Sequence, residues 1–172
     1  MWVFGYGSLM WDGWEVAWGC TRRVLADLPR YSRAFSKASI KNWGTKDAPC
    51  PTLNLSKQDT SVCRGIAFEF PDEHKKDVLN YLTKREGTGL RSMSVILQGS
   101  IEVSAFVAIY DGTNLIKKSL EETASLVRKA KGRYGSCFAY VKGITEKLAD
   151  LGVDDPVVTE FWRAVNDHAP DF

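Results

Sequence analysis

A glycine-rich segment close to the N-terminus is the first part of the sequence with the features of a binding site. Residues 2–4 (WVF) are apolar and favour a buried strand, and residues 5–9 (GYGSL) follow directly. Two glycines two positions apart let the backbone turn sharply, so that consecutive N–H groups can point into one space. Such a cluster of N–H groups binds an anion, typically a carboxylate or a phosphate. The third glycine of a dinucleotide-binding fingerprint is missing, so the segment does not indicate a Rossmann fold.

An acidic side chain at the end of a predicted helix is the second feature that could do chemistry. Apolar residues at positions 78, 79 and 82 predict a helix that starts near residue 71 and ends near Gly87. Arg85 and Glu86 occupy its last turn, where the negative end of the helix dipole disfavours a carboxylate. A carboxylate in this position either forms an ion pair or has a chemical role, and the position by itself leaves both interpretations open.

The composition is that of a soluble folded domain. The chain has 172 residues, of which 44% are hydrophobic and 26% charged, so we expect a single domain over residues 1–172. Its 23 basic and 21 acidic residues leave a net charge of +2, which favours neither a nucleic-acid partner nor a membrane surface. The sequence has no apolar run of the roughly 20 residues that a membrane span needs. Its N-terminus has no basic segment typical of a signal peptide, and we therefore expect a cytoplasmic protein.

The four cysteines, at positions 20, 50, 63 and 137, include no C-x-x-C pair. Zinc sites usually use closely spaced pairs, and the chain has only two histidines, so the sequence predicts no metal site. Because thiols stay reduced in the cytoplasm, we expect four reduced cysteines.

The order of the predicted elements is that of an α+β fold, without the regular alternation of strand and helix in a doubly wound sheet. The tryptophans at positions 11, 14 and 18 predict a loop or short helical turn at the edge of the core, with aromatic packing favoured over ligand stacking. Residues 35–62 are polar and rich in turn-forming residues, so we expect a long excursion outside the core. The other expected elements are strands at 63–70, 93–97 and 101–110, the last two joined by a turn at 98–100, and helices over 119–130, over 140–151 and from 156 onward.

Three segments of the chain together resemble the ChaC-like γ-glutamylcyclotransferases. They are MWVFGYGSLMW at the N-terminus, YSRAF at 31–35 and VLNYLTKREGTGLRS at 78–92, and the likeness continues to Gly132, Gly135 and Tyr140. The resemblance implies a small mixed β-sheet or barrel flanked by helices, in agreement with the α+β order of the elements. It also implies that the protein needs no metal and no organic cofactor.

The resemblance further implies roles for individual residues. Glu86 matches the carboxylate that acts as general base. Tyr140 keeps an aromatic residue of the family, and both a substrate contact and a place in the core are open for it. Four consecutive residues match the loop whose backbone holds the α-carboxylate of a γ-glutamyl group: Tyr6, Gly7, Ser8 and Leu9.

The implied reaction is the intramolecular cyclisation of a γ-glutamyl group, in which the substrate's α-amine attacks its own γ-carbonyl. The products are 5-oxoproline and an amine, so the enzyme would be a carbon–nitrogen lyase. With glutathione, the leading substrate, the released amine is Cys-Gly. Near neutral pH the attacking amine carries a proton, which Glu86 would accept and later return to the leaving nitrogen. The loop would hold the carboxylate so that amine and carbonyl face each other.

The chain departs from the family pattern at positions that could read the part of the substrate beyond the γ-glutamyl group: Ser36, Pro51, Leu90 and Cys137. We therefore expect activity on glutathione with relaxed selectivity against other γ-glutamyl amines. Two alternatives are the same reaction on another γ-glutamyl amine or dipeptide, and a non-catalytic γ-glutamyl-binding protein. The presence of Glu86 beside an intact loop disfavours the second alternative. The expected partner is a small molecule, with no nucleic acid and no membrane, and the sequence leaves a monomer or a homodimer open.

Overall fold

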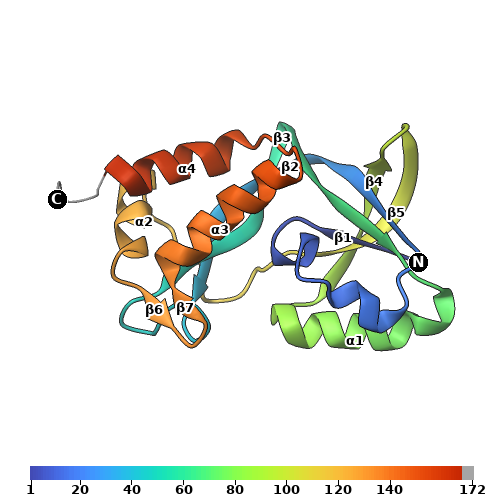
Figure 1. Ribbon diagram of the computed structural model, residues 1–172, viewed down its shortest axis with the longest axis horizontal. Helices are drawn as coiled ribbons and strands as arrows, with labels where there is room; N and C mark the ends of the chain where they lie inside the picture. Colours follow the sequence, from blue (N-terminus) through green and yellow to red (C-terminus); the bar gives the residue numbers. More distant parts are fainter. Residues whose placement is uncertain (168–172) are drawn as a thin grey trace. The chain divides into compact units, whose positions relative to one another are not determined.

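The computed structural model contains a closed barrel of five strands (Figure 1). The strands are β1 (Trp2–Gly5), β2 (Arg22–Ser39), β3 (Cys50–Glu69), β4 (Leu90–Leu97) and β5 (Ile101–Ala108). Their order around the barrel is β1-β3-β2-β4-β5. β1 pairs with β3 in antiparallel and with β5 in parallel orientation, whereas β4 and β5 form the expected hairpin. The α+β fold with a small mixed barrel is therefore confirmed.

The structure describes residues 1–167, and these residues divide into two compact units. The first unit comprises Met1–Ser32 and Leu55–Asp111, and the second comprises Arg33–Asn54 and the chain from Gly112 onward. β2 and β3 each contribute residues to both units. That residues 1–172 act as a single domain stays a prediction.

The core of the first unit is the interior of the barrel, which all five strands fill. Its buried side chains include Val3, Leu28, Phe68, Val95 and Val107. The helix α1 (Lys75–Glu86) contacts β4 and β5 and buries Val78 and Leu82, as their spacing predicts. The helix ends at Gly87, whose φ of 65° lies in the left-handed region that glycine adopts without strain. The predicted end of this helix is therefore confirmed.

The tryptophans near the N-terminus belong to the packing of the first unit. Two short 3-10 helices, η1 (Ser8–Met10) and η2 (Trp14–Trp18), follow β1. Trp14 is buried, and its ring centroid lies 5.5 Å from that of Phe68, 5.4 Å from that of Phe70 and 6.0 Å from that of Tyr81. The expected helical turn with aromatic packing is therefore confirmed at Trp14.

The second unit contains three helices that pack against one another: α2 (Leu120–Val127), α3 (Cys137–Asp150) and α4 (Pro156–Asp167). A short hairpin of β6 (Lys131–Gly132) and β7 (Gly135–Ser136) lies between α2 and α3 in the sequence. The predicted capping box of Ser119 and Glu122 opens α2. Asp155 accepts hydrogen bonds from two N–H groups at the start of α4 and pairs with the buried Arg33 at 2.7 Å. No helix within residues 1–167 is long and apolar enough to cross a membrane.

The expected excursion at residues 35–62 is wrong. β2 extends to Ser39 and β3 begins at Cys50, so that only residues 40–49 of this segment lie outside strands. Residues 50–55 are buried, whereas residues 56–60 are exposed. The exposed residues of this long strand are polar, so their composition is like that of a loop. Pairing with neighbouring strands, which composition does not reveal, makes them part of a strand. The strand expected at 63–70 is the last part of β3.

A disulfide bond joins Cys50 at the start of β3 to Cys137 at the start of α3. The expectation of four reduced cysteines is therefore wrong for this pair, whereas Cys20 and Cys63 are thiols. The bonded cysteines lie 87 residues apart in the sequence, and their Cα atoms lie 5.4 Å apart in the fold. Sequence spacing does not reveal such a pair, because a disulfide depends on the distance in space.

Candidate active site

The GYGSL loop begins where β1 ends and lies close against the barrel. Gly5 is the last residue of β1, and a Cβ atom built on it would lie 2.9 Å from the Cβ atom of Leu9. A Cβ atom on Gly65 of β3 would lie 2.3 Å from the Gly5 carbonyl oxygen. Both glycines thus permit a close approach that a side chain would block. Gly7 has a φ of −132°, so its place in the loop does not depend on a left-handed backbone.

After Gly7 the loop continues as the single turn of η1. The N–H group of Met10 donates to the Gly7 carbonyl at 2.8 Å, and that of Trp11 donates to the Ser8 carbonyl at 3.2 Å. The first N–H groups of a helical turn have no partner inside the turn. Those of Ser8 and Leu9 are therefore candidate donors to a carboxylate, and Ser8 is exposed.

Side chains of the first unit anchor the loop from within. The Tyr6 side chain is buried, and its hydroxyl donates to the Ala108 carbonyl at 2.7 Å. The Trp14 indole N–H donates to the Leu9 carbonyl at 3.1 Å, and the Arg23 guanidinium donates to the Met10 carbonyl. The Tyr6 side chain therefore fastens the loop to the end of β5.

Glu86 is the last residue of α1, and Arg85 beside it links the helix to the loop. The Arg85 guanidinium donates to the Ser8 hydroxyl at 3.1 Å and to the Asp12 carboxylate, and its Nε lies 3.4 Å from Glu86 Oε1. The Arg85 and Glu86 side chains are 22% and 23% exposed, so a ligand can reach them. Burial opposes the charge of Arg85, but hydrogen bonds to Asp12 and Tyr81 and the two neighbouring carboxylates outweigh it and raise the Arg85 pKa. Arg85 therefore stays a cation.

The structure thus links Glu86 and the GYGSL loop, predicted from two distant segments of the sequence, through Arg85, which contacts both. Asp12 and Tyr81 were not predicted from the sequence. Tyr81 lies four residues before Arg85 on α1, and its hydroxyl accepts a hydrogen bond from Arg85 at 3.2 Å. Helical spacing could have indicated this contact. No local pattern indicates Asp12, which lies 73 residues from Arg85 in the sequence.

Tyr140 belongs to the second unit, where it lies on α3. Its hydroxyl accepts a hydrogen bond from the Leu53 N–H group at 3.1 Å, and its ring centroid lies 5.3 Å from that of Trp43. The side chain is half-buried. These contacts support a structural role for Tyr140, and a contact with substrate stays a prediction.

The positions that depart from the family pattern lie in regular structure. Ser36 lies in β2, where its carbonyl accepts a hydrogen bond from the Ile116 N–H group at 2.7 Å. Pro51 is buried in β3, and Leu90 is the first residue of β4. Cys137 forms the disulfide bond, so this departure has a structural consequence of its own.

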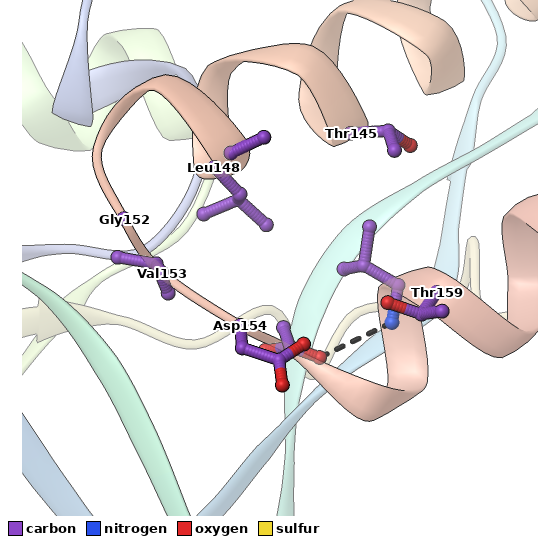
Figure 2. A pocket seen from close by; sticks show the side chains of 9 residues that line it. Thr145, Leu148, Gly152, Val153, Asp154 and Thr159 are labelled. Atoms are coloured by element: carbon purple, nitrogen blue, oxygen red, sulfur yellow. Dashed lines mark hydrogen bonds between the residues drawn. The ribbon is translucent and has the colours of Figure 1, made fainter.

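A pocket of about 330 Å³ lies in the second unit, between the end of α3 and the start of α4 (Figure 2). Its lining includes Thr145, Leu148, Gly152, Val153, Asp154 and Thr159. None of the residues predicted for the site lines this pocket, and its lining contains no basic residue that could hold a substrate carboxylate. Within the described part of the chain, no group of three or more His, Cys, Asp or Glu side chains could hold a metal ion.

Among solved structures, the fold is that of the γ-glutamylcyclotransferases. A γ-glutamylcyclotransferase specific to glutathione from yeast superposes with a TM-score of 0.85 over 98% of this chain and 96% of that chain, at 22% sequence identity. A second solved γ-glutamyl cyclotransferase superposes with a TM-score of 0.56 over 99% of this chain and 88% of that chain, at 12% identity. At these identities the likeness concerns the fold.

The sequence defines the family more narrowly. Residues 1–168 match the family described as ChaC-like protein, and the chain belongs to this family. Gamma-glutamylcyclotransferase 2-3 of Arabidopsis thaliana is 30% identical over 96% of this chain and 88% of its own length. The glutathione-specific gamma-glutamylcyclotransferase of Escherichia coli is 29% identical over 96% of this chain and 72% of its own length. The resemblance that the motifs indicated is therefore confirmed.

Proposed function

We propose that the chain is a γ-glutamylcyclotransferase that converts glutathione into 5-oxoproline and Cys-Gly, and thus a carbon–nitrogen lyase. The observation that carries the proposal is the hydrogen bond from Arg85, the neighbour of Glu86, to Ser8 in the GYGSL loop. This contact supports a site in which one small ligand meets both the proposed base Glu86 and the proposed carboxylate-binding loop. Membership in the ChaC-like family and the names of the relatives support the same activity.

Binding begins with the α-carboxylate of the γ-glutamyl group. The carboxylate accepts hydrogen bonds from backbone N–H groups of the loop, as anions do at clusters of such groups. The α-ammonium group is attached to the same carbon atom as the carboxylate. Because Arg85 ties the loop to the end of α1, a ligand held by the loop presents its ammonium group toward Glu86.

The reaction then needs no reactant other than the substrate. Glu86 accepts a proton from the ammonium group, and the amine attacks the γ-carbonyl carbon to form the carbon–nitrogen bond of a five-membered ring. The tetrahedral intermediate collapses as the bond to the leaving nitrogen breaks. Two protons leave the attacking nitrogen during the reaction, and Glu86 passes them, one at a time, to the leaving amine. Holding the substrate in the bent conformation favours the near-attack geometry in which intramolecular reactions reach effective molarities of about 10⁵–10⁸ M.

A second candidate is the same cyclisation with other γ-glutamyl amines as substrates. The departures from the family pattern favour it, because Pro51 is buried and Cys137 is bonded to Cys50 where polar residues would otherwise stand. Neither side chain can donate a charge-assisted hydrogen bond to the Cys-Gly part of glutathione. We therefore propose that glutathione is cyclised with relaxed selectivity.

The decisive experiment is the incubation of the purified protein with glutathione and with a panel of γ-glutamyl dipeptides, followed by measurement of 5-oxoproline. We expect 5-oxoproline and Cys-Gly in equal amounts from glutathione, and a large loss of product with Glu86→Gln. A protein that binds γ-glutamyl compounds but forms no 5-oxoproline from any of them is instead a non-catalytic binding protein.

We also propose a cytoplasmic location, which the reduced glutathione pool of that compartment supports. The disulfide bond between Cys50 and Cys137 is unusual for a cytoplasmic protein. Fractionation of cells after rapid alkylation of thiols tests both the cytoplasmic location and the presence of the Cys50–Cys137 disulfide bond in the cell. Recovery of the protein outside the cytoplasmic fraction would contradict the proposed location.

A further inference from the structure

Arg85 joins the GYGSL loop to the end of α1 through several contacts of one guanidinium group. Its Nη2 donates to Ser8 Oγ at 3.1 Å and to the Asp12 carboxylate, and its Nη1 donates to the Tyr81 hydroxyl at 3.2 Å. Its Nε lies 3.4 Å from Glu86 Oε1. Ser8 and Asp12 lie 77 and 73 residues from Arg85 in the sequence. One side chain therefore ties the loop to the helix end that carries Glu86.

The direction of the hydrogen bond between Arg85 and Ser8 follows from their chemistry. A guanidinium group has donors but no acceptor, so Ser8 Oγ accepts in this bond. A hydroxyl group has one proton of its own to donate, and the bond to Arg85 does not use it. A charged donor also polarises the group that it binds. Ser8 is exposed, so its proton can point toward a ligand in the loop.

Asp12 and Tyr81 hold the guanidinium group in this orientation. The Asp12 carboxylate balances the Arg85 charge and is itself only 33% exposed. The Tyr81 hydroxyl accepts from the other terminal nitrogen of the same group. Together with Ser8, these partners take both protons of Nη2 and one proton of Nη1, and so fix the guanidinium group with Nη2 against the Ser8 hydroxyl, the contact through which Arg85 acts on a ligand in the loop.

We propose that Arg85 is a positioning residue for the reaction, and that the Ser8 hydroxyl, oriented by Arg85, donates a hydrogen bond to the α-carboxylate of the γ-glutamyl group. This inference rests on the proposed function and adds a side-chain donor to the backbone donors of the loop. Lysine keeps the charge of arginine but lacks its planar fork of donors. Arg85→Lys therefore removes the orientation of Ser8 while the local charge stays.

The test measures glutathione binding by calorimetry in the Glu86→Gln background, where the ligand is not consumed. We expect Ser8→Ala and Arg85→Lys each to weaken binding by about 10- to 100-fold, as for the loss of a hydrogen bond to a charged group. The double variant should bind no more weakly than the single variants, because Arg85 acts through Ser8. Arg64→Lys is the matched control, since it alters a bidentate pair with Asp27 in the same unit, and it should bind like the parent.

Unchanged glutathione binding in Arg85→Lys would overturn the proposal. A double variant whose fold-loss of affinity equals the product of the two single fold-losses would overturn it as well. If melting shows that Arg85→Lys does not fold, Asp12→Asn replaces it, because this change frees the same guanidinium group from its carboxylate partner. The proposed function fails on a different observation, the absence of 5-oxoproline when the wild-type protein is incubated with glutathione. In that case the binding measurements on the Ser8→Ala, Arg85→Lys and double variants still test the hydrogen bond from Ser8 to the ligand.

Discussion

Replacing Glu86 with glutamine keeps the shape of the side chain and its capacity for hydrogen bonds, but removes its ability to accept the ammonium proton. Turnover of glutathione should therefore fall by roughly 10²–10⁴-fold, the usual contribution of a general base. This loss corresponds to about 2.7–5.5 kcal/mol in activation free energy. Glutathione binding should survive, because the loop and Arg85 are unchanged.

The stability of the Glu86→Gln variant should stay close to that of the wild type. Glu86 stands at the end of α1, where removal of a negative charge stabilises the helix by about 0.3–1 kcal/mol. Loss of the contact with Arg85, at 3.4 Å between partly exposed groups, costs about 0.2–1 kcal/mol. These effects oppose each other, so the free energy of unfolding should change by less than about 1 kcal/mol.

The assay measures 5-oxoproline at saturating glutathione and unfolding in urea for the wild type, Glu86→Gln and a control. Glu146→Gln makes the same chemical change at an exposed position on α3, where Glu146 pairs with Lys142. Turnover of Glu86→Gln within about tenfold of the wild type would refute the assignment of Glu86 as general base. An equal loss of turnover in Glu146→Gln would show that the effect is not specific to the site.

Four further outcomes are expected. Gly7→Val should weaken binding and slow turnover more than Ser8→Ala, because a side chain would occupy the space through which a carboxylate approaches the backbone. KM and kcat of the two variants test this ranking, and a Gly7→Val variant more active than Ser8→Ala would contradict it. Tyr140→Phe removes the acceptor of a hydrogen bond from the β3 backbone and should lower the free energy of unfolding by about 1 kcal/mol; a KM for glutathione raised in the folded variant would also place Tyr140 at the substrate. Replacing Cys50 and Cys137 with alanine should lower the free energy of unfolding by about 4–5 kcal/mol, as the chain-entropy relation gives for a cross-link across such a loop. Urea titrations with and without reductant measure this loss, and a value below about 1 kcal/mol would mean that the cross-link does not stabilise the protein. The ratio of kcat/KM for glutathione to that for γ-glutamyl-alanine should stay below about 10³, because each missing charge-assisted contact costs about 1.5–3 kcal/mol of discrimination. A higher ratio would refute relaxed selectivity but leave the proposed cyclisation reaction in place.

Features that depend on neighbouring residues were predictable from the sequence. α1 buries Val78 and Leu82 and ends at Gly87, because side-chain spacing and backbone preference act within a few residues. The capping box at the start of α2 and the hairpin of β4 and β5 follow from equally short patterns. The GYGSL loop and its likeness to the ChaC-like family were visible for the same reason, since its glycines are close together in the sequence.

Features that join distant segments were decided by the tertiary structure. Residues 35–62 have the composition of a loop, yet pairing in the barrel makes most of them parts of β2 and β3. Cys50 meets Cys137 across 87 residues, and Arg85 meets Asp12 across 73. Strand pairing and the packing of helices bring these groups together once apolar side chains are buried. Spacing along the chain carries no record of such contacts, because distance in sequence does not determine distance in the folded core.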